Sequence, residues 1–378
     1  MDEKNYINYH ILISHSPSNL NRDDMNMQKT AVFGGTKRTR ISSQSLKRAI
    51  RQSDYYKKNI SQPSDRTRQL GQLTEKYVKI LHDKYPENIV KSVISLISGE
   101  SEIKVDTQSG AVAAWVVSEV ESYCQLYQQL QKENPDNKEF EKAWKNATDK
   151  KKLIEDKTKL SIFRKTLQNG QDIALSGRMA TSGIMTIVDA SLAVAHAITT
   201  HTVDGDIDWF TAVDDLNKDT GETGSAHLDT TEFSSGVFYR YASLNIRQLQ
   251  ENLGDVKREQ ALEIAAHVLH LLATVVPSAK QNSFAAFNLA DFAFVSFSDQ
   301  PISLANAFEN PVKAATDGLM TPSINAFVNY HKAICKAYGL KDDKQACFST
   351  KKCEIKKNVT NKGNDFSALK EWLKSNGN

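Results

Sequence analysis

A basic run near the N-terminus is the part of this sequence whose residue types could most readily do chemistry. Between Lys37 and Arg51 there are six cations and no acid, although the formal net charge of the chain is only +3. The six cations are Lys37, Arg38, Arg40, Lys47, Arg48 and Arg51. A local basic cluster on a nearly neutral chain indicates binding of a polyanion such as nucleic acid. The alternative is an ordinary solvated charged face.

An acidic segment near the middle of the chain carries the opposite charge. Between Asp204 and Glu232, nine acids accompany one cation, Lys218. Two segments of opposite charge would let copies stack head to tail, with the acids of one copy facing the basic surface of the next. Trp209 and Phe210 interrupt this polar stretch. Taken alone, they would form a hydrophobic anchor that docks on a neighbouring molecule.

Metal sites are not indicated by the residue spacing. Two histidines, His267 and His270, fall within an apolar helical pattern that favours packing over ligation. The run Asp204-x-Asp206-x-Asp208 begins like a calcium loop, but its sixth position is Trp209 where glycine is needed. No Cys-x-x-Cys pair occurs among the four cysteines, Cys124, Cys335, Cys347 and Cys353.

Two other readings of the chemistry remain open. A metal-dependent RNase would use Asp23 or Asp24, although no third ligand lies nearby in the sequence. An ordinary RNA-recognition protein would read a short motif through alternating aromatics, Phe292, Phe294 and Phe297. Such aromatics more often pack a core. We therefore expect no catalytic residues, no metal and no cofactor.

The basic run must be positioned by the elements around it. Residues 6–13 are rich in β-branched and aromatic side chains and predict a buried strand, which residues 16–19 should end. A long loop without structure of its own is expected from Asn19 to Thr39. Ser42 or Ser43 should then cap a helix that continues to about Tyr56.

The later elements alternate in type. Residues 62–170 predict a helical insertion, and residues 203–233 predict a segment that projects from the core. Strands are predicted at 237–246 and 292–297, and an amphipathic helix is predicted at 258–276. This order predicts an α+β fold with helices on one face of a mainly antiparallel sheet. With 378 residues, 40% of them hydrophobic, and no visible signal peptide or apolar run of membrane length, we expect a globular cytoplasmic protein.

Several blocks closely resemble the backbone subunit of Cascade (CasC), the type I-E CRISPR surveillance complex. Near the N-terminus these are SHSP at 14–17, NRDDMNMQK at 21–29 and RISSQSLKR at 40–48. Further along they are ALSGRMATSG at 174–183, HAITTH at 196–201, DIDWFTAVDD at 206–215 and EFSSGVFYRY at 232–241, followed by residues 251–288. Residues 62–165 and the end of the chain beyond about 340 match poorly.

The resemblance implies a modified RRM-like (ferredoxin-like) palm, a helical fingers insertion and an extended thumb loop. The corresponding segments are 1–61, 185–202 and 234–345 for the palm, 62–184 for the fingers, 203–233 for the thumb and 346–378 for a C-terminal tail.

The resemblance also implies a non-catalytic role in antiviral defence. Family members bind CRISPR RNA (crRNA) independently of sequence and assemble head to tail as a homo-oligomer within a ribonucleoprotein. Each copy flips one base, and the remaining bases pair with target DNA in an R-loop. The implied partners are the guide, the target DNA, further copies, other Cascade subunits and a separately recruited helicase-nuclease, with no membrane.

Nine residues match family positions associated with the guide. Cationic side chains suit phosphate, and neutral donors near a helix N-terminus add hydrogen bonds, although a solvated cation is the alternative for Arg51. An apolar group would sit at the flipped nucleotide. The phosphate-facing set is Arg22, Lys29, Ser42, Gln44, Lys47 and Arg51, and the apolar set is Met179, Trp209 and Phe210.

Overall fold

A computed structural model describes residues 3–149, 170–179, 187–212, 227–340, 344–351, 360–361 and 365–378. The chain divides into two units. The first comprises Met1–Ser53, Ala193–Leu244 and Leu262–Asn378, and the second comprises Asp54–Leu192 and Asn245–Ala261. Both contain helices and antiparallel strands, so the predicted α+β class is confirmed.

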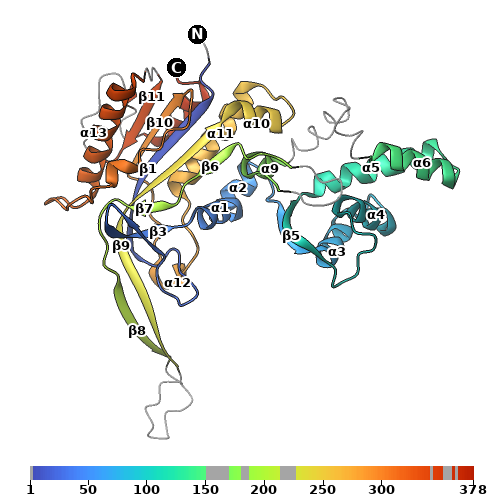
Figure 1. Cartoon of the computed structure of the whole chain (residues 1–378), viewed down its shortest axis with the longest axis horizontal. Coiled ribbons are helices and arrows are strands. Elements are labelled where there is room, and N and C mark those ends of the chain that lie inside the picture. The colour runs from blue at the N-terminus through green and yellow to red at the C-terminus, as the bar shows by residue number, and fades with distance from the viewer. Residues whose placement is uncertain are drawn as a thin grey trace, which may run out of the picture. The chain divides into compact units, whose positions relative to one another are not determined.

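A mainly antiparallel sheet organises the first unit (Figure 1). In the described residues it has ten strands, eight of them in the order β12-β11-β10-β1-β9-β7-β3-β2, with β6 and β8 paired to β9. The strands are β1 (Tyr6–Ser18), β2 (Thr30–Phe33), β3 (Thr36–Ile41), β6 (Leu192–Val194), β7 (Ala197–Thr199), β8 (Asp206–Ala212), β9 (His227–Asn245), β10 (Phe292–Ser298), β11 (Gln345–Ser349) and β12 (Thr360–Asn361). The helices are α1 (Ser43–Gln52), α11 (Arg258–Thr274), α12 (Gln281–Phe284), a 3₁₀ turn (Ala305–Phe308), α13 (Met320–Tyr338) and α14 (Phe366–Lys374).

Helices cover β1 on both faces. The Tyr9 hydroxyl donates to the carbonyl of Ala265 in α11 (3.1 Å), whereas the adjacent His10 ring packs on Phe327 of α13. Neighbouring residues of a strand point to opposite faces, so the two helices lie on opposite sides of the sheet. The expectation of helices on one face was wrong. It failed because β1 is buried almost continuously and does not alternate between buried and exposed residues.

The segment expected to be a long loop contains a hairpin. Strands β2 and β3 pair from Thr30 opposite Thr39 to Phe33 opposite Thr36. Gly34 and Gly35 form the turn, both with positive φ (57° and 73°). Two-residue hairpin turns need this backbone conformation, which glycine adopts without steric cost. The irregular part is therefore confined to residues 19–29, which we call the first loop.

A two-stranded ribbon extends β9 beyond the rest of the sheet. Strand β8 pairs with the start of β9 from Asp206 opposite Phe233 to Ala212 opposite His227. Figure 1 shows the two strands leaving the sheet side by side. We call residues 206–212 and 227–233 the ribbon. Strand β9 thus begins ten residues before the predicted position.

Two other boundaries differ from expectation. Strand β1 continues through Pro17 to Ser18, beyond the last residue paired with β10, Leu12. Helix α1 ends at Gln52 rather than near Tyr56, because Ser53 adopts an extended conformation (ψ 146°).

The second unit is mostly helical around its own core. Its core includes Leu73, Tyr77, Val93 and Trp115. The antiparallel pair of β4 and β5 was not expected in a region predicted to be mainly helical. The elements are α2 (Asp54–Asn59), β4 (Asp65–Gln69), α3 (Leu70–Leu81), α4 (Glu87–Ser98), β5 (Gln108–Trp115), α5 (Val117–Glu133), α6 (Asn137–Ala147), α9 (Gln171–Ser176) and α10 (Ile246–Asn252).

A buried arginine closes the C-terminal end of α11. Arg240 donates to the carbonyls of Leu272 (3.0 Å) and Val275 (2.8 Å), where the helix dipole favours a cation. It also donates to Nε2 of His15 (3.1 Å), so this imidazole must be neutral and accept at Nε2. Burial, and then the charge of Arg240, lowers the pKa of His15 to about 3.

Acid should therefore destabilise the first unit. Between pH 6.5 and 3, His15 is protonated in the unfolded state but stays neutral in the folded state. Because the unfolded state binds the additional proton, the free energy of unfolding falls as pH falls. The slope is about 1.4 kcal/mol per pH unit from this group. Urea unfolding from pH 7 to 5 measures it. His15→Gln should flatten the acid slope, the exposed His82→Gln should not, and equal slopes in all three proteins would contradict the assignment.

Within the described residues, no helix has both the length and the apolar character needed to cross a membrane.

Candidate nucleic-acid interface

The first loop and the start of α1 are joined by one asparagine. The side-chain oxygen of Asn21 accepts from the backbone N–H of Ser42 (2.8 Å), and its carbonyl accepts from the N–H of Lys29 (2.8 Å). Three of the predicted guide-contacting residues, Arg22, Lys29 and Ser42, are thereby brought together. Asn21 was not among the predicted site residues, because its role depends on where the chain returns.

Helix α1 begins at a real cap. The Ser42 hydroxyl oxygen accepts from the N–H of Ser45 (3.2 Å), so Ser42 is the cap of the two serines that were predicted for this role. Ser42 itself is buried, whereas Gln44 is exposed. Leu46 and Ile50 face the core, which leaves the other side of α1 for its polar residues. Lys47 and Arg51, one turn apart, are both half-buried.

The first loop is shaped by its own side chains. The Arg22 guanidinium donates to the Asn26 side chain (2.8 Å) and is exposed. One oxygen of Asp23 accepts from the N–H groups of Met25 (2.9 Å) and Met27 (3.0 Å), which makes it a turn-forming carboxylate. No group of three or more potential metal ligands occurs in the part of the chain that is described. Nothing in this geometry favours the RNase reading over the binding one.

The basic run does not present all six cations. Arg38 is fully buried and donates to the carbonyls of Thr199 (3.1 Å) and Phe308 (2.9 Å), so it ties the sheet to a distant turn. Arg40 donates through Nε to the carbonyl of Thr30 (3.1 Å) within the hairpin. The polyanion interpretation must therefore rest on the cations of α1 and of the first loop.

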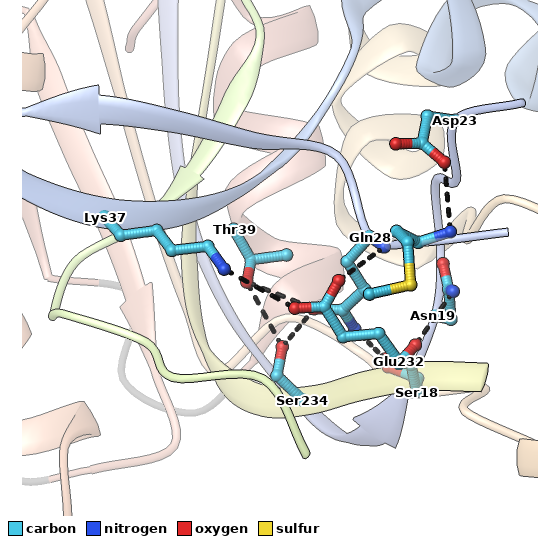
Figure 2. Close-up of polar contacts among 9 residues, drawn as sticks. Ser18, Asn19, Asp23, Gln28, Lys37, Thr39, Glu232 and Ser234 are labelled. Atoms are coloured by element: carbon cyan, nitrogen blue, oxygen red, sulfur yellow. Dashed lines mark hydrogen bonds and ion pairs between the residues drawn. The ribbon is translucent and has the colours of Figure 1, made fainter. Parts of the chain in front are cut away.

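The acidic segment also contains a residue with an internal partner (Figure 2). The Glu232 side chain is 8% exposed, and one of its oxygens accepts from the N–H of Gln28 (3.0 Å). The other lies 3.5 Å from Nζ of Lys37. For Glu232, the expectation that the acids face a neighbouring copy was wrong. Asp214, Asp215, Asp219 and Glu222 lie outside the described residues.

The apolar candidates lie on different parts of the fold. Trp209 is on β8, opposite Thr230, and 67% of its surface is exposed. The adjacent Phe210 belongs to the same strand, but its side chain lies outside the described part. Met179 belongs to the second unit and is 83% exposed. Large apolar side chains this exposed indicate contact surfaces.

A buried ion pair fixes the backbone beside Met179. Arg178 donates to both carboxylate oxygens of Glu119 (2.6 and 3.0 Å), and both side chains are almost fully buried. The backbone of Arg178 also exchanges two hydrogen bonds with Val188 (2.8 and 2.9 Å). Glu119 could not be predicted as part of this pair, because it lies 59 residues from its partner in the sequence.

The aromatic strand is a core element. Phe292, Phe294 and Phe297 are each no more than 3% exposed, and Phe294 packs on Phe327 and His331. Buried rings cannot stack on bases, so the reading as an ordinary RNA-recognition protein that uses these three residues was wrong.

The remaining metal candidates also have other surroundings. His270 packs on Phe366, and burial followed by the charge of Lys370 lowers its pKa to about 4. Cys124 and Cys347 are buried, Cys335 is half-buried, and Cys353 lies outside the described residues.

The comparisons with known proteins place the chain in a family. It matches the family described as CT1975-like protein over residues 7–375 and belongs to that family. A chain from a solved "CRISPR RNA-guided surveillance complex, pre-nicking" is 26% identical to it with a TM-score of 0.76, and the match covers 98% of this chain and 100% of that one. A chain from a "CRISPR RNA-guided surveillance complex" is 23% identical with a TM-score of 0.57 and 98% coverage of both, which shows the shared fold. No curated protein matches.

Proposed function

We propose that this chain is a non-catalytic, RNA-binding backbone subunit of a type I-E Cascade surveillance complex. The observation that carries the proposal is the likeness, over nearly the whole of both chains, to a chain of an RNA-guided surveillance complex. The cations on α1 and the first loop support it, because a subunit that accepts any spacer must hold the sugar-phosphate backbone rather than read bases.

The nine candidate residues divide the work. Arg22, Lys29, Lys47 and Arg51 neutralise phosphates, and Ser42 and Gln44 add neutral hydrogen bonds near the N-terminus of α1. Met179, Trp209 and Phe210 occupy the position of one flipped base per subunit. Each unstacked step costs about a few kcal/mol, which apolar contact with the neighbouring bases offsets in part.

Assembly follows from this division. Copies lie head to tail along the spacer of a CRISPR RNA in the cytoplasm. The bases between two flipped positions stay stacked and can pair with target DNA. Other Cascade subunits complete the complex, and a separate helicase-nuclease cuts the target. The proposed parts are a palm at 1–61, 185–202 and 234–345, fingers at 62–184, a thumb at 203–233 and a tail at 346–378.

The decisive measurement is the mass of the assembled protein with and without RNA. Purified chain mixed with a CRISPR RNA should form a particle of several subunits, and nuclease treatment should shorten or dissolve it. Two guides with unrelated spacers should give the same mass and affinity. A strong preference for one spacer, or a single subunit per RNA at saturation, would overturn the proposal.

The same particles test the RNase alternative. With complementary RNA and Mg²⁺, we expect the RNA to stay intact. Regularly spaced cuts that Asp23→Ala or Asp24→Ala abolishes would establish the enzyme instead.

A further inference from the structure

One buried carboxylate connects two segments that are about 200 residues apart in the sequence. Glu232 lies at the base of the ribbon, opposite Ile207, and accepts from the backbone N–H of Gln28 in the first loop. The Glu232 carbonyl accepts from the side chain of Asn19 (2.9 Å), whose amide also donates to the carbonyl of Asn26 (3.2 Å). Both ends of the first loop are thus attached to the same ribbon residue.

The Gln28 side chain completes the connection. Its oxygen accepts from the hydroxyls of Ser234 (2.8 Å) and Thr39 (3.3 Å), and its amide donates to the carbonyl of Ser18. Figure 2 shows these groups converging around Glu232 and Gln28 from β1, β3, β9 and the first loop. Most of these hydrogen bonds connect the first loop to strands β1, β3 and β9.

The charge on Glu232 is weakly compensated for a buried group. Its ion-pair partner Lys37 is half-exposed and lies 3.5 Å away. A buried carboxylate is costly unless its oxygens accept hydrogen bonds, so the Gln28 N–H is strongly bound to it. Gly205 leaves space for the carboxylate, because a Cβ there would lie 2.2 Å from Oε1 of Glu232, the oxygen that faces Lys37.

We propose that Glu232 is a positioning residue that holds the first loop against the ribbon before any RNA arrives. The loop carries Arg22 and Lys29, and the ribbon carries Trp209. We call the contacts of Glu232 with the first loop the lock. The lock therefore holds the proposed phosphate contacts and the proposed base-flipping residue Trp209 on one preformed surface. This inference rests on the proposed function for its RNA side. Without the Glu232 contacts, RNA binding must also order the loop, and the apparent affinity is the intrinsic affinity multiplied by the fraction of molecules in which the loop is docked.

Hydrogen exchange of the free protein tests the lock directly. Glu232→Ala should speed amide exchange in residues 18–29 and 230–234 on the order of ten- to a hundredfold, the loss expected for a bond to a charged group. Glu232→Gln, which keeps an acceptor, should fall between wild type and alanine. Exchange across the β1–β10 pairs should not change, which separates loss of the lock from general loss of stability.

A steric variant tests the same contact without changing any charge. Gly205→Ala should displace the carboxylate and reproduce the faster loop exchange. Gly110→Ala is the matched control, because a Cβ there meets nothing within 4 Å. Both Glu232→Ala and Gly205→Ala should lower the RNA affinity in proportion to the fraction of molecules whose loop stays docked, and the loop exchange rates relative to an unstructured peptide give that fraction.

Two results would overturn the inference. One is unchanged loop exchange in Glu232→Ala, and the other is faster exchange throughout the first unit. If the wild-type protein binds no RNA, the proposed function fails, but loop exchange in the free protein still decides whether Glu232 holds the loop. If RNA binds normally to a Glu232→Ala protein whose loop exchanges as fast as an unstructured peptide, Glu232 holds the loop but does not position it for RNA, and the inference fails while the proposed function stands.

Discussion

Replacing Arg178 with methionine should lower the free energy of unfolding of the second unit by about 3–5 kcal/mol. The substitution leaves the Glu119 carboxylate buried without its bidentate partner, and an uncompensated buried charge is among the most destabilising single changes. Urea unfolding measures the loss. Amide exchange of the peptides that contain Val188 should rise as well, because its backbone pairs with that of Arg178.

A double variant separates the buried charge from the lost volume. Arg178→Met with Glu119→Leu removes both charges and should recover most of the stability, since well-packed apolar groups can replace a buried ion pair. Lys84→Met, which breaks the exposed pair with Glu121, should change little. A double variant as unstable as the single one would show that the charge is not the cause.

The features predicted from sequence are those with a local signal. Ser42 caps α1, Leu46 and Ile50 face the core, and the apolar run from Tyr6 forms the central strand. Each of these depends on neighbours within a few positions, where propensity and periodicity act. The Gly34-Gly35 turn also carried a local signal, a two-glycine hairpin turn flanked by strand-forming residues, which the expectation of a long loop overlooked.

The features that escaped prediction depend on contacts between distant residues. Arg38 looks like any surface cation in the sequence, but carbonyls 161 and 270 residues away bury it. Glu232 looks like part of an acidic face, but the chain returns Gln28 to it across 204 positions. Counting charges therefore overestimated both the basic and the acidic surface, because burial and pairing are properties of the tertiary structure.

Removing the four candidate phosphate contacts together should nearly abolish RNA binding at physiological salt. The variant carries Arg22→Gln, Lys29→Gln, Lys47→Gln and Arg51→Gln. Each neutralised phosphate of a single strand contributes roughly 0.7 to the slope of log affinity against log salt, so four lost contacts should flatten it by about 2.8 per subunit. Near 0.15 M salt this corresponds to an affinity on the order of a hundredfold weaker. Titrations at several salt concentrations with two unrelated RNA sequences measure both quantities.

A second variant with the same change in net charge serves as the control. Four exposed lysines elsewhere serve for it, with the substitutions Lys79→Gln, Lys91→Gln, Lys257→Gln and Lys313→Gln. If a long-range field attracted RNA to the chain, the two variants would lose affinity equally. If α1 and the first loop grip the phosphates directly, the first variant loses far more, and loses it equally for both RNA sequences. A loss confined to one of the two sequences would mean that these side chains read bases, which a subunit serving every spacer cannot do.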